Sequence, residues 1–186
     1  MLKITKAGFA EYTVNKSRFI AVAECCEDER AAAIFLRKLA TQHQSAHHLA
    51  YAFRLKTEQG IVQRFSDAGE PSGTAGKPIL QFLEGRDLIN VCVGVIRYYG
   101  GINLGTGGLA RAYGGTGKLA IEDATIVPYV EMKQLKLKLD YKELDYFSRE
   151  IAKIDGVLLD KAFGDGVTVL VSIPEPSVDA ILKRFT

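Results

Sequence analysis

The chain has 186 residues, of which 47% are hydrophobic, and its formal net charge at pH 7 is +2. This apolar content is sufficient for a packed core and excludes intrinsic disorder, and the small net charge excludes the strongly basic composition of a histone-like binder. No apolar run approaches the roughly 20 residues that a membrane-spanning helix needs, and the N-terminal segment lacks the continuous apolar stretch of a signal peptide.

The first part of the chain contains two predicted pairs of strands with a helix between them. Strands at residues 11–14 and 18–24 turn at Asn15 and Lys16, a polar pair that suits a tight hairpin. Residues 28–42 predict a helix, because acidic side chains crowd its first turn. Strands at 48–55 and 61–65 follow, with a turn at Gly60.

Cysteine spacing indicates free thiols. Cys25, Cys26 and Cys92 form no Cys-x-x-Cys pair. The first two are adjacent and would point to opposite faces of a strand, so a disulfide between them would be strained. We therefore expect reduced cysteines and a cytoplasmic protein.

Two glycine-rich loops come next. Residues 66–78 (SDAGEPSGTAGKP) are too rich in Gly, Ser and Pro for regular structure, and Pro78 suits the start of a short helix over 79–83. A buried strand is predicted at 88–99. The second loop, 100–108, leads into a helix that ends near residue 122. Nine of the 18 glycines lie between residues 94 and 117, which indicates a need for backbone freedom or close backbone approach.

A domain boundary is expected near Pro128. Beyond it, a half-exposed strand at 133–140 precedes a helix at 141–154, strands at 157–162 and 167–173, and a helix at 177–185. This βαββα order is the ferredoxin-like pattern without its last strand. Residues 1–127 carry 15 basic and 12 acidic side chains, whereas residues 128–186 carry 9 and 10, so an anionic partner is expected to prefer the first domain.

Nucleotide cofactors are not favoured by the glycine motifs. Residues 105–110 (GTGGLA) fit the dinucleotide pattern G-x-G-x-x-A, but a loop separates them from the preceding strand, and no acidic residue ends a strand about 20 residues later. The Gly-Lys pairs at 76–77 and 117–118 are followed by Pro78 and Leu119 instead of the Ser or Thr that a P-loop uses to bind Mg²⁺. We therefore expect no cofactor.

Glycine loops that lead into helices can present several backbone N–H groups to an anion, such as a nucleic-acid phosphate. Basic side chains lie nearby in the sequence, and an exposed tyrosine can stack on a base. The alternative, that these are tight structural turns with solvated charges and core tyrosines, remains open. The candidate nucleic-acid or anion-binding residues are Lys77, Arg97, Tyr98, Tyr99, Gly100, Gly101, Gly105, Gly107, Gly108, Arg111, Tyr113 and Lys118.

Four further residues could serve as acid–base groups if they converge in one cleft: His47, His48, Asp67 and Glu70. Their spacing shows no catalytic triad, and Asp67 is equally suited to bond the amides of its own turn. The histidines, including His43, match no zinc spacing, so no metal site is expected.

The segments 66–78 and 95–115 (VIRYYGGINLGTGGLARAYGG) resemble those of the YigZ/IMPACT family. The stretch 15–21 (NKSRFIA) and the paired His47 and His48 also match, so that the resemblance covers essentially the whole chain.

Two residues depart from the family pattern. Ala68 stands where the family usually has a second aspartate, and Gly94 replaces a usual aliphatic residue. The first departure weakens any proposal of a two-carboxylate site.

The resemblance implies an α+β fold in two domains. Residues 1–127 would form an IMPACT N-terminal-like domain with the fold of a ribosomal protein's second domain, a β-sheet with helices on one face. Residues 128–186 would form a ferredoxin-like domain similar to domain V of elongation factor G, with or without its final strand. Eukaryotic relatives regulate translation through a stress-kinase activator, by way of an extra domain, so that route of regulation is not carried over.

We therefore expect a non-enzymatic protein that associates with RNA or the ribosome, binds phosphate through its glycine-rich loops and Arg and Lys side chains, and regulates translation. One alternative is a hydrolase or other enzyme that acts on a small anionic or peptide substrate. A second is a protein-binding scaffold. The expected partners are RNA or the ribosome and proteins of the translation machinery, and no membrane.

Overall fold

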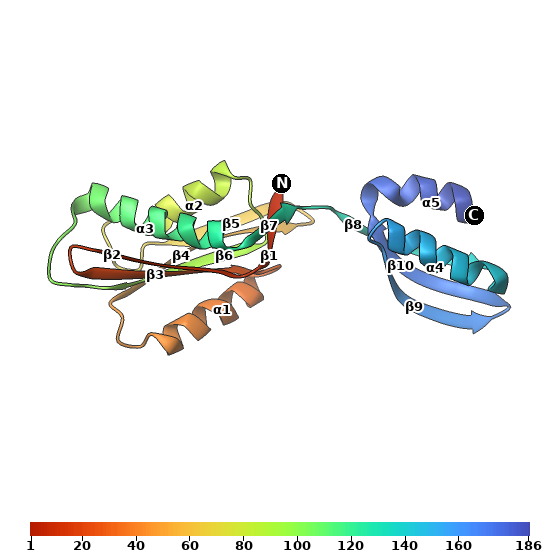
Figure 1. Cartoon of the computed structure of the whole chain (residues 1–186), viewed down its shortest axis with the longest axis horizontal. Coiled ribbons are helices and arrows are strands. Elements are labelled where there is room, and N and C mark those ends of the chain that lie inside the picture. The colour runs from red at the N-terminus through yellow and green to blue at the C-terminus, as the bar shows by residue number, and fades with distance from the viewer. The chain divides into compact units, whose positions relative to one another are not determined.

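The computed structural model describes residues 1–186, and the chain divides into two compact units, residues 1–129 and 130–186 (Figure 1). No helix in the chain has the length and apolar character that crossing a bilayer requires.

Unit 1 is built on a five-stranded antiparallel sheet with the order β2-β3-β6-β4-β5. Asn15 and Lys16 join β2 and β3 with φ values of 46° and 63°, as a type I′ hairpin turn requires. The other hairpin is β4-β5, and β6 lies between the two hairpins. The strands are β2 (Gly8–Val14), β3 (Ser17–Cys25), β4 (His48–Thr57), β5 (Gly60–Ser66) and β6 (Val91–Tyr98).

Helices cover both faces of this sheet (Figure 1). They are α1 (Glu29–Gln42), α2 (Gly76–Gly85) and α3 (Gly105–Asp123). Side chains alternate along β3, so Phe19 joins the core under α2 and α3, whereas Ile20 joins the core under α1. The α+β class is confirmed, but the expectation of helices on one face only is wrong, because a strand that is apolar on both sides needs cover on both sides.

A small second sheet joins the two ends of unit 1. β1 (Leu2–Lys6) pairs antiparallel with β7 (Thr125–Pro128), and the backbone N–H of Tyr129 donates to the carbonyl of Met1 at 3.1 Å. Local sequence patterns predict neither β1 nor β7, because the only strand partner of each lies at the opposite end of the unit's sequence.

Unit 2 is a three-stranded antiparallel sheet, order β8-β10-β9, with two helices on one face (Figure 1). Its core includes the rings of Phe147 and Phe185, whose centroids lie 4.8 Å apart in an edge-on arrangement. The βαββα order of the ferredoxin-like pattern is confirmed. The elements are β8 (Met132–Leu139), η1 (Tyr141–Glu143), α4 (Leu144–Lys153), β9 (Val157–Gly164), β10 (Gly166–Pro174), η2 (Glu175–Ser177) and α5 (Val178–Phe185).

Candidate anion-binding site

The first glycine-rich loop is closed by its own aspartate. The carboxylate of Asp67 accepts hydrogen bonds from the backbone N–H groups of Gly73 (2.8 Å), Ala75 (3.1 Å) and Gly76 (2.9 Å). Burial acts to raise the pKa of Asp67, but the backbone donors favour the charged form, and the pKa lies below its ordinary value. Because α2 begins at Gly76, this carboxylate already occupies the positive end of that helix. The first of the two predicted anion pockets is therefore filled by the chain itself.

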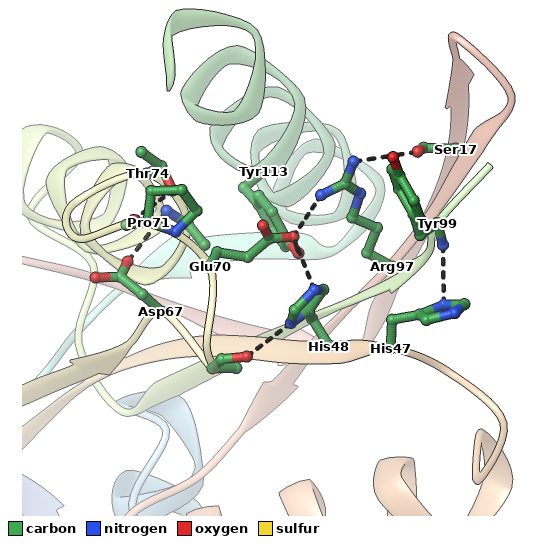
Figure 2. Close-up of polar contacts among 12 residues, drawn as sticks. Ser17, His47, His48, Asp67, Glu70, Pro71, Thr74, Arg97, Tyr99 and Tyr113 are labelled. Carbon is green, nitrogen blue, oxygen red and sulfur yellow. Dashed lines mark hydrogen bonds and ion pairs between the residues drawn. The ribbon is translucent and has the colours of Figure 1, made fainter. Parts of the chain in front are cut away.

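Glu70 and Arg97 form a buried ion pair (Figure 2). Arg97 Nη1 lies 2.7 Å from Glu70 Oε1, and both side chains are 5% exposed. Arg97 Nη2 donates to Ser17 Oγ at 3.3 Å, and the guanidinium lies 5.1 Å from the ring centroid of Tyr99. The prediction that Arg97 binds phosphate is therefore corrected. Breaking the ion pair would leave the buried Glu70 carboxylate unpaired, at a cost of about 3–5 kcal/mol.

Tyr113 also belongs to the hydrogen-bonded network around Glu70. Its side chain is fully buried on α3, its hydroxyl donates to Glu70 Oε1 at 2.7 Å, and its ring packs edge-on against Phe19. Burial, and then the bond to the carboxylate, raise the pKa of Tyr113 far above its ordinary value. The prediction that Tyr113 stacks on a base is corrected, because a fully buried ring presents no face to a ligand.

The other two tyrosines take different positions. Tyr98 packs against the core under α1, on the sheet face opposite α3, and its hydroxyl lies 2.7 Å from His43 Nδ1. Tyr99 is 40% exposed, and its hydroxyl donates to Asn103 Oδ1 at 3.0 Å. Only Tyr99 keeps an accessible ring beside the second loop.

Of the four acid–base candidates, only His48 and Glu70 come together (Figure 2). His48 Nε2 lies 3.5 Å from Glu70 Oε1, and its Nδ1 lies 2.7 Å from the carbonyl of Ala68, so Nδ1 carries the proton of this bond. His47 Nδ1 instead accepts the backbone N–H of Tyr99 at 3.0 Å. The same Glu70 oxygen already accepts hydrogen bonds from Arg97 and Tyr113. The His48–Glu70 pair is therefore better suited to holding the first glycine-rich loop in place than to transferring protons. No group of three or more His, Cys, Asp or Glu side chains is arranged to hold a metal ion.

The second glycine-rich loop remains open. A Cβ at Gly100 would collide with the carbonyl of Lys16, so this loop lies directly against the β2-β3 turn. The first turn of α3 has no capping side chain, because Leu104 stands at its N-cap, and Gly105 and Gly107 are exposed. A cavity of about 360 Å³ adjoins this turn and has Glu70 in its wall, so its charge is mixed.

Arg111 and Lys118 lie along the exposed side of α3. A Cβ added at Gly107 would meet Arg111 Nη1 at 3.3 Å, which places the guanidinium beside the first turn of the helix. Arg111 has no hydrogen-bond or ion-pair partner in the chain, and the one ion pair of Lys118 is with Glu122 at 3.9 Å. Seven residues are two helical turns, so these two cations project on the same side about 10 Å apart along the axis.

These two cations line a cavity of about 530 Å³ between α3 and β2, which we call the α3 groove. Tyr12, Val14, Gly115 and Leu119 also line it, together with Glu122, the ion-pair partner of Lys118. Sequence reasoning missed Tyr12 and Leu119, since no local pattern distinguishes an aromatic strand residue in the core from one beside a helix. Lys77 is exposed on the first turn of α2 and does not line the α3 groove.

Comparison with known proteins identifies relatives over nearly the whole chain. The family model described as the Impact N-terminal domain matches residues 15–121. An "IMPACT family member" of Haemophilus influenzae is 36% identical over 177 residues, covering 95% of this chain and 86% of the relative. "IMPACT family member YigZ" of Escherichia coli is 34% identical, covering 89% of this chain and 81% of that protein. A solved structure titled "Crystal structure of an hypothetical protein" is 30% identical with a TM-score of 0.72, covering 98% and 89% of the two chains.

Proposed function

The chain belongs to the IMPACT family, and on that premise we propose that it is a non-enzymatic RNA-binding protein that works with the translation machinery. The link to translation comes from the resemblance of its two parts to a ribosomal-protein domain and to domain V of elongation factor G. RNA or the ribosome, and proteins that act with them, are the proposed partners.

The observation that carries the proposal is the partnerless Arg111 beside the uncapped start of α3. A guanidinium next to unpaired backbone N–H groups suits a phosphate oxygen, which accepts hydrogen bonds from both. Lys118, two turns further on, adds a second positive charge on the same side of the helix. Two cations at this spacing suit successive contacts along one RNA backbone.

An enzymatic role has weaker support. Asp67 is bonded to the start of α2, and the Glu70 oxygen nearest His48 already accepts from Arg97 and Tyr113. A general base needs a free lone pair within reach of its substrate.

A cytoplasmic location is part of the proposal. Cys25, Cys26 and Cys92 are free thiols, and burial raises the pKa of Cys26 to about 12, which keeps it protonated and unreactive. Free cysteines are typical of reducing compartments.

The test is binding of a fluorescein-labelled RNA hairpin with a single-stranded tail, measured by anisotropy at several salt concentrations. The Arg111→Ala/Lys118→Ala variant is expected to bind at least tenfold more weakly. The slope of log K against log salt should fall by about 1.5, since each lost phosphate contact removes about 0.7–0.9.

The matched control is Arg37→Ala/Lys38→Ala on α1, which removes the same charge from the opposite face of the sheet. It should bind RNA like the parent protein. Equal loss in both variants would mean that only net charge matters, and no loss in the first would contradict the proposal.

A further inference from the structure

The α3 groove combines exposed apolar side chains with its two cations. Tyr12 is 44% exposed and Leu119 is 46% exposed, and both line the groove beside Arg111 and Lys118. A phosphate contact alone requires no apolar wall. The groove therefore suits a ligand that carries negative charge and a flat apolar surface together.

The ring of Tyr12 belongs to an edge strand and points toward α3. Tyr12 pairs with Phe19, which packs in the core under α2 and α3, so the two side chains share that face of the sheet. Phe9, three residues earlier on β2, lies on the opposite face and is outside the groove. Because β2 is the last strand of the sheet, the ring has no neighbouring strand on its outer side, and it is 44% exposed.

Gly115 leaves bare backbone in the wall of the groove. A Cβ at this position would meet nothing within 4 Å, whereas one at Gly114 would meet Pro78 at 3.1 Å, and one at Gly117 would meet Ile79 at 3.6 Å. Glycine inside a helix is destabilising relative to alanine. The contact at Gly114 would be tight and that at Gly117 an ordinary van der Waals contact, so packing within the chain accounts for the missing Cβ at 114 but not at 115. The bare surface at Gly115 therefore points to close approach by a ligand.

We infer that the α3 groove binds unpaired bases of single-stranded RNA, with a base stacked on Tyr12 and the strand passing over Gly115. This inference rests on the proposed function and names its ligand class. In a duplex the base faces are hidden by stacking, so only an unpaired base can cover the tyrosine ring. An added peptide strand fits less well, because the backbone N–H of Phe9 on β2 already donates to Asp123 Oδ2 at 2.9 Å.

The first experiment compares a labelled 12-nucleotide unstructured RNA with a blunt duplex of the same length. Tyr12→Ala is expected to weaken single-strand binding about tenfold and to leave duplex binding unchanged. Tyr12→Phe keeps the ring and should bind like the parent. Phe9→Ala, which removes another exposed aromatic ring of β2 on the other face, is the control and should have no effect. If Tyr12→Ala does not fold, Tyr12→Leu removes the ring and keeps apolar bulk.

The second experiment fills the groove from the helix side. Gly115→Leu should lower single-strand affinity about tenfold without lowering the melting temperature, because leucine is a good helix former and has open space there. Gly85→Leu on α2 is the matched control, since a Cβ there also meets nothing within 4 Å and the position is outside the groove. It should leave RNA affinity unchanged.

The outcomes of these experiments distinguish this inference from the proposed RNA-binding function on which it rests. If the Arg111 and Lys118 variant loses RNA binding but the Tyr12 and Gly115 variants do not, the groove inference is wrong and the proposed function stands. Duplex binding as tight as single-strand binding would also overturn it. If no RNA binds and a polyglutamate peptide binds in an Arg111-dependent way, both ideas fail and the groove belongs to a protein partner.

Discussion

The carboxylate of Glu70 is a meeting point for side chains from three separate elements. Arg97 reaches it from β6, Tyr113 from α3 and His48 from β4 (Figure 2). The glycine-rich loop that carries Glu70 is thereby attached to the sheet and to the helix at once. We interpret this cluster as the support that holds the second loop and the start of α3 in position.

Removing one partner of this buried pair should be costly. We expect Arg97→Met to reduce the free energy of unfolding by about 3–5 kcal/mol, because Glu70 would stay buried without its cation. The double variant Glu70→Gln/Arg97→Met should lose less than the single Arg97→Met. Urea unfolding, followed by NMR signals of unit 1, measures both losses.

The control for these two variants is Arg37→Met, a substitution at an exposed position of α1. It should change the free energy of unfolding by no more than about 0.5 kcal/mol. If the double variant lost as much stability as Arg97→Met or more, the ion pair would not couple the loop to the sheet.

At the scale of elements, the two glycine-rich loops differ in what satisfies the helix that follows. Asp67 supplies an internal anion to α2, whereas α3 begins at Leu104 without a capping side chain. Apolar residues are poor N-caps, so α3 gives up local stability at its start. The N–H groups at the start of α2 are therefore bonded within the chain, whereas those at the start of α3 remain free for an external anion.

The bonds of Asp67 predict a pH-dependent stability. The lowered pKa of Asp67 means that its stabilising effect is fully present above the unfolded value of about 3.9 and is lost as the pH falls through the lower folded value. Asp67→Asn should therefore cost about 1.5–3 kcal/mol of unfolding free energy at pH 7, since an amide replaces a charged acceptor.

The difference between parent and Asp67→Asn should shrink as the pH falls below about 4. Urea unfolding of both proteins at pH 7 and pH 3 provides the measurement, with Glu58→Gln in the exposed β4-β5 turn as the control. A difference that stays constant across this range would mean that the charge of Asp67 does not hold the loop.

At the scale of the whole molecule, the pairing of β1 with β7 defines where unit 1 closes. The two strands bring the beginning and the end of the unit together, and Tyr129 bonds to Met1 just beyond them. We propose that unit 1 folds independently, and that its limit is set by β7 and not by the end of α3.

Two truncations test this proposal. A chain that ends after Tyr129 should keep the NMR spectrum of unit 1, apart from peaks near the cut, because β7 remains paired with β1. A chain that ends after Ala124 removes β7 and should melt several degrees lower, since β1 loses its hydrogen-bonded partner. Equal melting temperatures would show that this small sheet does not stabilise the unit.

Local chemistry in the sequence was enough to predict most elements and the family. Asn15 and Lys16 adopt the left-handed turn that joins β2 and β3, and Asp28 accepts the N–H of Ala31 at the start of α1. Both signals act over a few residues, so they are readable without the fold. The paired strands β1 and β7 were missed because their contact joins opposite ends of the unit.

The tertiary structure decided which of the candidate side chains are free to bind. Arg97 and Arg111 are the same residue type beside the same glycine-rich loop, yet one is buried against Glu70 and the other has no partner. Composition and spacing cannot separate them, because burial and charge pairing depend on residues that come together only when the sheet and α3 pack. The sequence therefore determined the kind of chemistry, and the fold determined which side chains can still perform it.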